Sequence, residues 1–167
     1  IKPSNVILSA TGQVKILDFG ISRADMDRDA PTSSFQMGTE RYMAPEQWLE
    51  NRSGPEVDIY ALGLMGLEML VGKTLPRLPL DYSIHSAEVE DRIQALNINA
   101  PPLFQDLVRT LFWEMIQFKT DHRPSAEDVY ERCSGLVDEL GGETLRQYAL
   151  RQNQEIEQNA IVDMGVS

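Results

Sequence analysis

The sequence has little cysteine and few basic residues, and each shortage excludes a class of protein. With one cysteine among 167 residues the chain has no internal disulfide, so a disulfide-stabilised fold is excluded and a reducing compartment is favoured. That cysteine, Cys133, is predicted to be a small buried side chain within a helix. Lys and Arg number 15 against 26 Asp and Glu, and the resulting net charge of -11 argues against nonspecific binding to nucleic acid or to an anionic membrane.

Long apolar runs are also missing. No stretch reaches the roughly 18 apolar residues that a membrane-spanning helix needs, and the N-terminus does not have the pattern of a signal peptide. The composition, 42% hydrophobic and 25% charged, is that of an ordinary globular protein, and the length suits one domain. Because the sequence begins with Ile1 and not with Met, we expect either a processed chain or the downstream part of a longer protein.

Residues 5–17 are predicted to form a β-hairpin. Strand-forming apolar residues flank the turn sequence Ala10–Gly12 on both sides. The hairpin places Asn5 just before its first strand and Asp18 just after its second, so both side chains are expected at the same end. Amide and carboxylate oxygens are ligands that Mg²⁺ accepts, although either residue alone is more often a capping or turn residue.

A long segment without periodicity follows the hairpin and runs from Asp18 to Glu46. A loop of this length in a compact domain is usually functional or disordered. It begins with Asp-Phe-Gly, ends with Gly-Thr-Glu-Arg-Tyr-Met-Ala-Pro-Glu and carries a hydroxyl-rich stretch, Thr32, Ser33 and Ser34. Pro45 suits the first turn of a helix, because that position has no hydrogen bond for a backbone N–H to donate.

The rest of the chain is predicted to be helical. Residues 56–71 are apolar on nearly every side, which predicts a helix buried at the centre of the core. Asp58 near its start is expensive to bury unless its carboxylate accepts hydrogen bonds, and Gly63 permits another element to approach closely. His85 is predicted to lie on a surface loop, and further helices are predicted over residues 87–96, 103–118, 125–140 and 143–158.

Five short motifs occur in the order and at the separations found in protein kinases. They are Lys2-Pro3-Ser4-Asn5, Asp18-Phe19-Gly20, Gly38-Thr39-x-x-Tyr42-x-Ala44-Pro45-Glu46, Asp58-x-Tyr60-x-x-Gly63 and Arg123-Pro124. Over about residues 1–140 the chain therefore resembles the C-terminal half of a eukaryotic-type (Hanks-type) serine/threonine protein kinase domain. The resemblance implies an α+β fold, namely the mostly helical large lobe of a kinase, truncated at its N-terminus and carrying one small β-hairpin. Residues 141–167 are then a polar helical extension.

The resemblance also implies a role for each motif residue. Asn5 and Asp18 are expected to hold Mg²⁺ and, with Lys2, to contact ATP, while Lys2 and Thr39 assist at the acceptor hydroxyl. Structural roles are implied for Phe19, Gly20, Tyr42, Glu46, Asp58, Gly63 and Arg123.

The resemblance also implies specific partners for several residues. Glu46 is expected to form a buried ion pair with Arg123, although without the resemblance Arg123 would be assigned to the surface. Asp58 is expected to accept backbone N–H bonds from the catalytic loop. Thr32, Ser33 and Ser34 are candidate phosphorylation sites, with Arg23 as a partner for the phosphate.

Other parts of a kinase are not in this sequence. Ile1 to Ser4 fill the spacing between the catalytic-base Asp and Asn5, so the resemblance places that Asp immediately before Ile1. The complete protein is expected to act in the cytoplasm and to transfer the ATP γ-phosphoryl group to Ser or Thr hydroxyls of proteins, whereas this fragment alone is expected to be inactive. The alternative is a kinase-like scaffold (pseudokinase) that only binds proteins, but such a scaffold has no need to retain Asn5 and Asp18.

Overall fold

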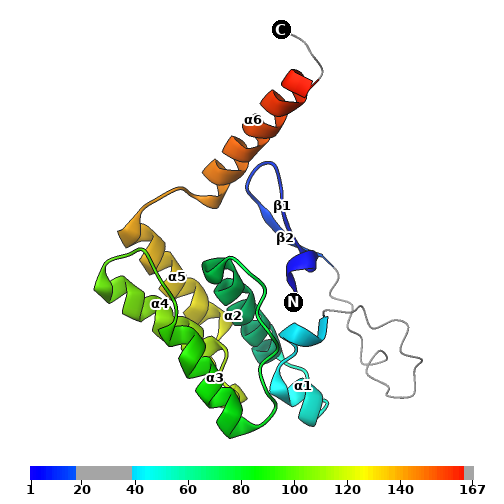
Figure 1. Ribbon diagram of the computed structural model, residues 1–167, viewed down its shortest axis with the longest axis vertical. Coiled ribbons are helices and arrows are strands. Elements are labelled where there is room, and N and C mark those ends of the chain that lie inside the picture. Colours follow the sequence, from blue (N-terminus) through cyan, green and yellow to red (C-terminus); the bar gives the residue numbers. More distant parts are fainter. Residues whose placement is uncertain (18–38, 164–167) are drawn as a thin grey trace, which may run out of the picture. The chain divides into compact units, whose positions relative to one another are not determined.

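The computed structural model describes residues 1–17 and 39–163, which form helices and one small sheet (Figure 1). The sheet consists of β1 (Val6–Leu8) and β2 (Val14–Ile16). The helices are α1 (Pro45–Leu49), α2 (Pro55–Val71), α3 (Tyr82–Gln94), α4 (Pro102–Met115), α5 (Ala126–Leu140) and α6 (Leu145–Asp163). The predicted fold class, a mostly helical α+β structure with one hairpin, is confirmed.

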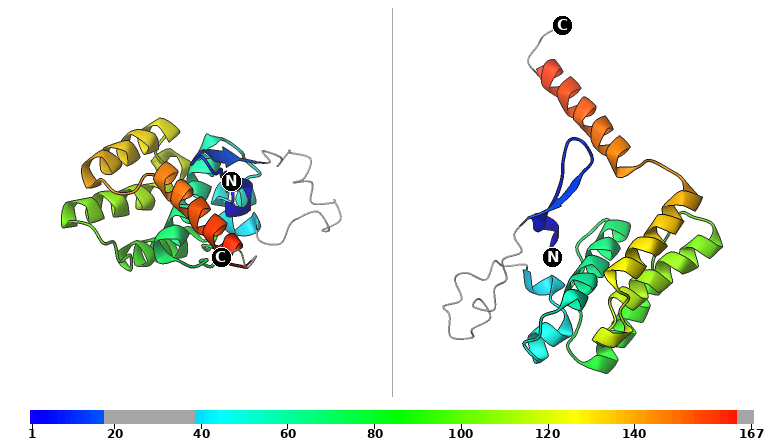
Figure 2. Two further views of the ribbon diagram at one scale, coloured as in Figure 1. Left: turned by 90° about the horizontal axis from the view of Figure 1, so that it is seen from above. Right: turned by 180° about the vertical axis from the view of Figure 1, so that it is seen from behind.

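The chain divides into two compact units. The first comprises residues 1–2 and 20–140, and the second comprises residues 3–19 and 141–167. In the described part of the first unit, α2 packs against α4, and α4 also contacts α3 and α5, as the view from behind shows (Figure 2, right). Ile59 of α2, Leu111 and Met115 of α4 and Val129 of α5 form its core, with Phe112 packed against them.

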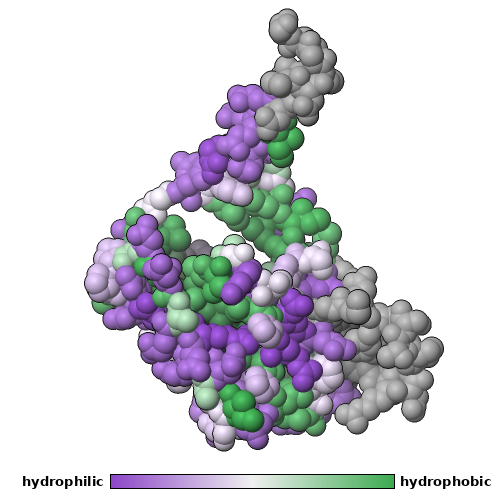
Figure 3. Space-filling view, viewed as in Figure 1, coloured by the Kyte–Doolittle hydropathy of each residue, from purple (hydrophilic) through white to green (hydrophobic). Residues whose placement is uncertain are grey.

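Helix α2 occupies the place in the core that its apolar sequence predicts. Residues Ile59, Tyr60, Ala61, Leu64, Met65 and Leu67 are buried. Its last turn is different, because Met69 is 81% exposed and Leu70 and Val71 are also exposed. Gly72 ends the helix in the left-handed conformation, with φ of 72°, which glycine adopts without steric cost. Apolar residues of the hairpin are exposed as well, and Figure 3 shows apolar surface over both regions (Ile7, Leu8, Val14, Ile16 and Leu17 in the hairpin).

Gly63 lies where α2 packs closely against the end of α4, as the sequence predicts for a glycine at this place. A Cβ atom added to it would lie 2.7 Å from Cγ2 of Ile116 and 2.9 Å from Cβ of Met115. Both distances are shorter than a van der Waals contact, so a larger residue must push the helices apart.

Substituting Gly63 with alanine is therefore expected to lower the free energy of unfolding by about 1–3 kcal/mol, the usual cost of overpacking a core. Urea unfolding followed by circular dichroism measures this effect. Gly135→Ala in α5 is the matched control, because nothing lies within 4 Å of its added Cβ, and it is expected to be neutral or slightly stabilising. Equal midpoints for the two variants would contradict the assigned role of Gly63.

Helix α3 differs from its prediction. It begins at Tyr82 rather than near Ala87, because Asp81 caps it by accepting hydrogen bonds from the backbone N–H groups of Ser83 and Ile84, each at 3.0 Å. His85 therefore lies inside the helix and is buried, with 1% of its surface exposed. The prediction of a surface loop at His85 is wrong.

Helices α5 and α6 bring two further differences. Ser125 and Asp128 cap α5 reciprocally, as predicted, but Cys133 is exposed on this helix and not buried. Helix α6 continues to Asp163, beyond the predicted end at residue 158. Within the second unit it contacts the hairpin, where the Asn153 side chain donates to the Ala10 carbonyl at 3.0 Å. Among the described residues, no helix combines the length and apolar character that a membrane span requires.

Candidate active site

The hairpin brings Asn5 beside the residue that precedes Asp18. Strands β1 and β2 are antiparallel, with Val6 opposite Ile16, so Asn5 lies opposite Leu17. The Leu17 backbone N–H donates to the Asn5 carbonyl at 2.6 Å and closes this end of the hairpin. The turn at the other end needs Gly12, whose φ is 79°. The sequence predicts that Asn5 and Asp18 lie at the same end of the hairpin. The described residues place Asn5 opposite Leu17, the residue before Asp18.

Several predicted site residues lie outside the residues that the structure describes. Asp18, Phe19 and Gly20 lie there, as do the candidate phosphorylation sites Thr32, Ser33 and Ser34. Lys2 is partly buried and belongs to the first unit. Thr39 starts a short 3₁₀ helix, Thr39–Tyr42, which leads toward α1.

The 3₁₀ helix is tied to α2 through Tyr42. The Tyr42 hydroxyl donates to Oε2 of Glu68 at 2.6 Å, while Oε1 of Glu68 accepts from the backbone N–H of Leu75 at 2.8 Å. Burial, together with the hydrogen bond to the Glu68 carboxylate, raises the pKa of Tyr42 to about 12, so the hydroxyl keeps its proton at neutral pH. Sequence reasoning identified Tyr42 but missed Glu68, whose signal was a carboxylate between apolar residues in the second half of α2.

Glu46 is held at the start of α1 by local capping. Ala44 precedes the helix, Pro45 fills its first position, and the Gln47 side chain accepts from the Ala44 backbone N–H at 2.9 Å. The Glu46 carbonyl accepts from the backbone N–H groups of Glu50 at 3.0 Å and Arg52 at 3.2 Å. These contacts leave the Glu46 carboxylate buried inside the first unit.

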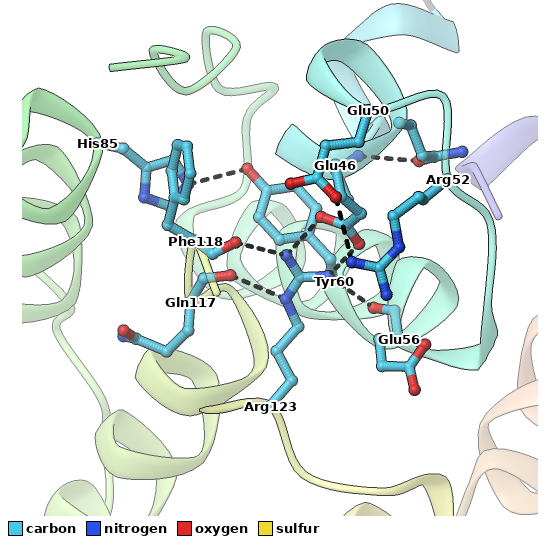
Figure 4. Close-up of polar contacts among 11 residues, drawn as sticks. Glu46, Glu50, Arg52, Glu56, Tyr60, His85, Gln117, Phe118 and Arg123 are labelled. Carbon is cyan, nitrogen blue, oxygen red and sulfur yellow. Dashed lines mark hydrogen bonds and ion pairs between the residues drawn. The ribbon is translucent and has the colours of Figure 1, made fainter. Parts of the chain in front are cut away.

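Arg123 meets that carboxylate in a bidentate ion pair, as the resemblance implies (Figure 4). Nη1 lies 2.7 Å from Oε1 and Nη2 lies 2.9 Å from Oε2 of Glu46, and the two side chains are 0% and 6% exposed. The remaining guanidinium donors are satisfied by backbone carbonyls of Gln117 at 2.8 Å, Glu56 at 3.0 Å and Phe118 at 3.1 Å. Because every buried donor has an acceptor, the pair fixes the end of the long segment to the helical core.

Tyr60 and His85 surround this ion pair, and neither was assigned a role from sequence. The Arg123 guanidinium carbon lies 4.8 Å from the centre of the Tyr60 ring, a cation–π contact. The Tyr60 hydroxyl lies 3.2 Å from Nε2 of His85. Burial, with the nearby Arg123 and Arg92 charges, lowers the pKa of His85 to about 4, so the imidazole is neutral at pH 7. The aromatic residue two places after Asp58 was the available signal for Tyr60, whereas nothing local indicated His85.

Asp58 is not buried, although its place near the start of an apolar helix had suggested burial at a cost in desolvation free energy. Its side chain is 55% exposed, and Oδ1 accepts from the Ile1 amino nitrogen at 3.3 Å. Exposure to water removes most of the desolvation cost, so no set of backbone donors is required. The contact nevertheless links the start of α2 to the stretch that contains Lys2, which is the region the resemblance assigned to Asp58.

Comparison with known proteins agrees with this geometry. Residues 1–133 match the family described as the protein kinase domain. The chain is 44% identical over 73 residues to the serine/threonine-protein kinase PknA of Mycobacterium tuberculosis, covering 44% of this chain and 17% of that protein. It is 33% identical over 112 residues to the serine/threonine-protein kinase PknL of the same organism, covering 65% of this chain and 28% of that protein.

A plant relative is similar over a longer stretch. The chain is 32% identical over 136 residues to mitogen-activated protein kinase kinase 2 of Arabidopsis thaliana, covering 78% of this chain and 37% of that protein. The chain thus spans between about a sixth and two fifths of the length of these relatives. With its ordered motifs, its hairpin and its buried Glu46–Arg123 pair, the chain belongs to the protein kinase domain family.

Proposed function

We propose that the complete protein containing this chain is a serine/threonine protein kinase, which transfers the γ-phosphoryl group of ATP to Ser or Thr hydroxyls of proteins. The observation that supports this most directly is the hydrogen bond from the Leu17 N–H to the Asn5 carbonyl, because it places Asn5 beside the strand end that leads to Asp18. In this proposal residues 1–140 are the catalytic portion and residues 141–167 a helical extension. Because ATP is the phosphoryl donor, we assign this domain to the cytoplasm.

The residue types of Asn5 and Asp18 suit magnesium. Mg²⁺ prefers hard oxygen ligands and usually takes one or two from protein, and an amide oxygen from Asn5 with a carboxylate from Asp18 meets that requirement. The ion, when bound, neutralises negative charge on the phosphate oxygens. Lys2 would add a positive charge beside the transferring group, and the Thr39 hydroxyl would bridge Lys2 and the catalytic Asp, as in the kinases that the chain resembles.

The remaining described contacts support positioning. Phosphoryl transfer depends mainly on orientation and charge stabilisation, so the segment that receives the substrate has to be held rigidly. Tyr42 bound to Glu68 and Glu46 bound to Arg123 hold the two ends of the stretch 42–46 against the core. Phosphate on Thr32, Ser33 or Ser34 would add about two negative charges, which Arg23 would pair with, as a means of activation.

Changing Asp18 to Asn in the complete protein tests this function. The variant is expected to lose activity by at least about 100-fold, because it weakens metal binding where charge develops in the transition state. The measurement is transfer of ³²P from labelled ATP to a protein substrate at one fixed Mg²⁺ concentration, just sufficient for full activity of the wild type. Asp25→Asn, which removes a carboxylate from the same segment, is expected to retain activity. Equal rates for the wild type and Asp18→Asn would refute the proposal, and a wild type that binds proteins without any transfer would favour the scaffold alternative.

A further inference from the structure

His85 contacts both groups that flank Arg123. Its Nε2 atom lies 3.2 Å from the Tyr60 hydroxyl, and its ring meets the Phe118 ring edge-on, with centroids 5.2 Å apart and an interplanar angle of 88°. The Tyr60 ring lies beneath the Arg123 guanidinium, and the Phe118 carbonyl accepts from Arg123 Nη2. Figure 4 shows these groups around Arg123, with His85 on the side away from Arg52.

The hydrogen bond between Tyr60 and His85 joins two groups that are uncharged at neutral pH. Arg123 from the turn before α5 and Arg92 from the same helix face His85, and no carboxylate among the described groups affects it strongly enough to offset them. Arg92 is itself paired with Glu88. Burial also keeps Tyr60 protonated, because it raises the pKa of the phenol. The hydrogen bond therefore joins two uncharged groups, and the tautomer of His85 decides which of them donates.

We propose that His85 is a positioning residue for the stretch 42–46, which belongs to the segment that receives the substrate. It acts through Tyr60 and Arg123 on Glu46. The imidazole fixes the Tyr60 ring through the hydrogen bond to its hydroxyl, and it fixes Phe118 by ring contact. Both then hold the Arg123 guanidinium in the plane that matches the Glu46 carboxylate. This inference rests on the proposed kinase function for its kinetic consequence, but its structural consequence does not depend on catalysis.

Two backbone amides report the position of Glu46 directly. The N–H groups of Glu50 and Arg52 both donate to the Glu46 carbonyl. If Glu46 loosens, these amides exchange with solvent through local opening while amides elsewhere in the core keep their protection. Hydrogen exchange therefore distinguishes loss of positioning from general loss of stability.

The experiment uses the complete protein with the variants His85→Leu, His85→Gln and Tyr60→Phe and the double variant His85→Leu/Tyr60→Phe. In His85→Leu, exchange at Glu50 and Arg52 is expected to rise about fivefold to tenfold, the change expected for one lost hydrogen bond. The KM for the protein substrate is expected to rise while the KM for ATP stays unchanged. His85→Gln keeps a side chain that can donate or accept a hydrogen bond, and it is expected to restore both the exchange rate and the KM for the protein substrate. The double variant is expected to be no worse than the poorer single variant.

His122→Leu is the matched control, because the side chain of His122 is 51% exposed and the same substitution there is expected to change none of these readouts. The inference is overturned if exchange in His85→Leu rises equally at all core amides, or if the effects of His85→Leu and Tyr60→Phe simply add. A complete protein without kinase activity would refute the proposed function only, since the exchange measurement still decides the role of His85.

Discussion

Replacing Arg123 with methionine is expected to lower the free energy of unfolding of the chain by about 3–5 kcal/mol, the cost of breaking a buried ion pair by removing one partner. The Glu46 carboxylate, 6% exposed, would remain buried without a cation. The carbonyls of Glu56, Gln117 and Phe118 would also lose their donor. Urea unfolding of residues 1–167 near pH 7, followed by circular dichroism, measures the loss.

Two further variants identify its cause. The double variant Arg123→Met/Glu46→Gln is expected to recover part of the stability, because no uncompensated charge is left inside the core. Arg52→Met is the surface control: its pair with Glu50 is 65% and 54% exposed, and it is expected to matter by less than about 1 kcal/mol. If Arg123→Met were no more harmful than Arg52→Met, the ion pair would contribute nothing to the fold.

The chain is expected to lose about 3 kcal/mol of stability as pH falls from about 6.5 to about 4 through His85 alone, since each unit of pKa difference corresponds to about 1.4 kcal/mol. The folded His85 has a pKa lowered from 6.5 to about 4, so in this interval the unfolded chain binds a proton that the folded chain does not. Stability is therefore complete above the unfolded pKa and falls as the solution is acidified. Urea midpoints measured at half-unit steps from pH 7.5 to 4.5 give the slope.

His85→Gln separates this contribution from that of the carboxylates. The variant has no ionisable group at this position, so its stability is expected to change less steeply over the same pH interval. His122 is exposed and is present in both proteins, which removes it from the comparison. Parallel pH profiles for the wild type and His85→Gln would contradict a neutral buried imidazole.

The parts of the fold that follow from local pattern could be predicted. The hairpin depends on strand formers around a glycine turn, and α2 depends on a continuous apolar stretch, so both are evident in a short window of sequence. The Glu46–Arg123 pair joins residues 77 positions apart and came only from the resemblance to kinases. A lone arginine before a proline gives no physical reason to expect complete burial.

The errors arose where contacts across the fold decided the outcome. The nearby prolines suggested a loop at His85, whereas Asp81 caps a helix that already includes it. The burial of His85 also depends on contacts with Tyr60 and Phe118, which are distant in sequence. Asp58 was expected to be buried because it lies near the start of an apolar helix, and Cys133 because of its residue type, yet both side chains are exposed. A periodic pattern predicts which residues share a face, but not how far a neighbouring element extends over it.

The two oxygens of Glu68 have a thermodynamic consequence. One oxygen holds Tyr42, which precedes α1, and the other holds the backbone of Leu75, which follows α2. If either stretch detaches, one oxygen of the Glu68 carboxylate loses its hydrogen-bond donor. The free energy of opening one stretch therefore depends on whether the other is closed. We therefore expect the 3₁₀ turn at residues 39–42 and the connection after α2 to open together, although more than thirty positions of sequence separate Tyr42 from Leu75.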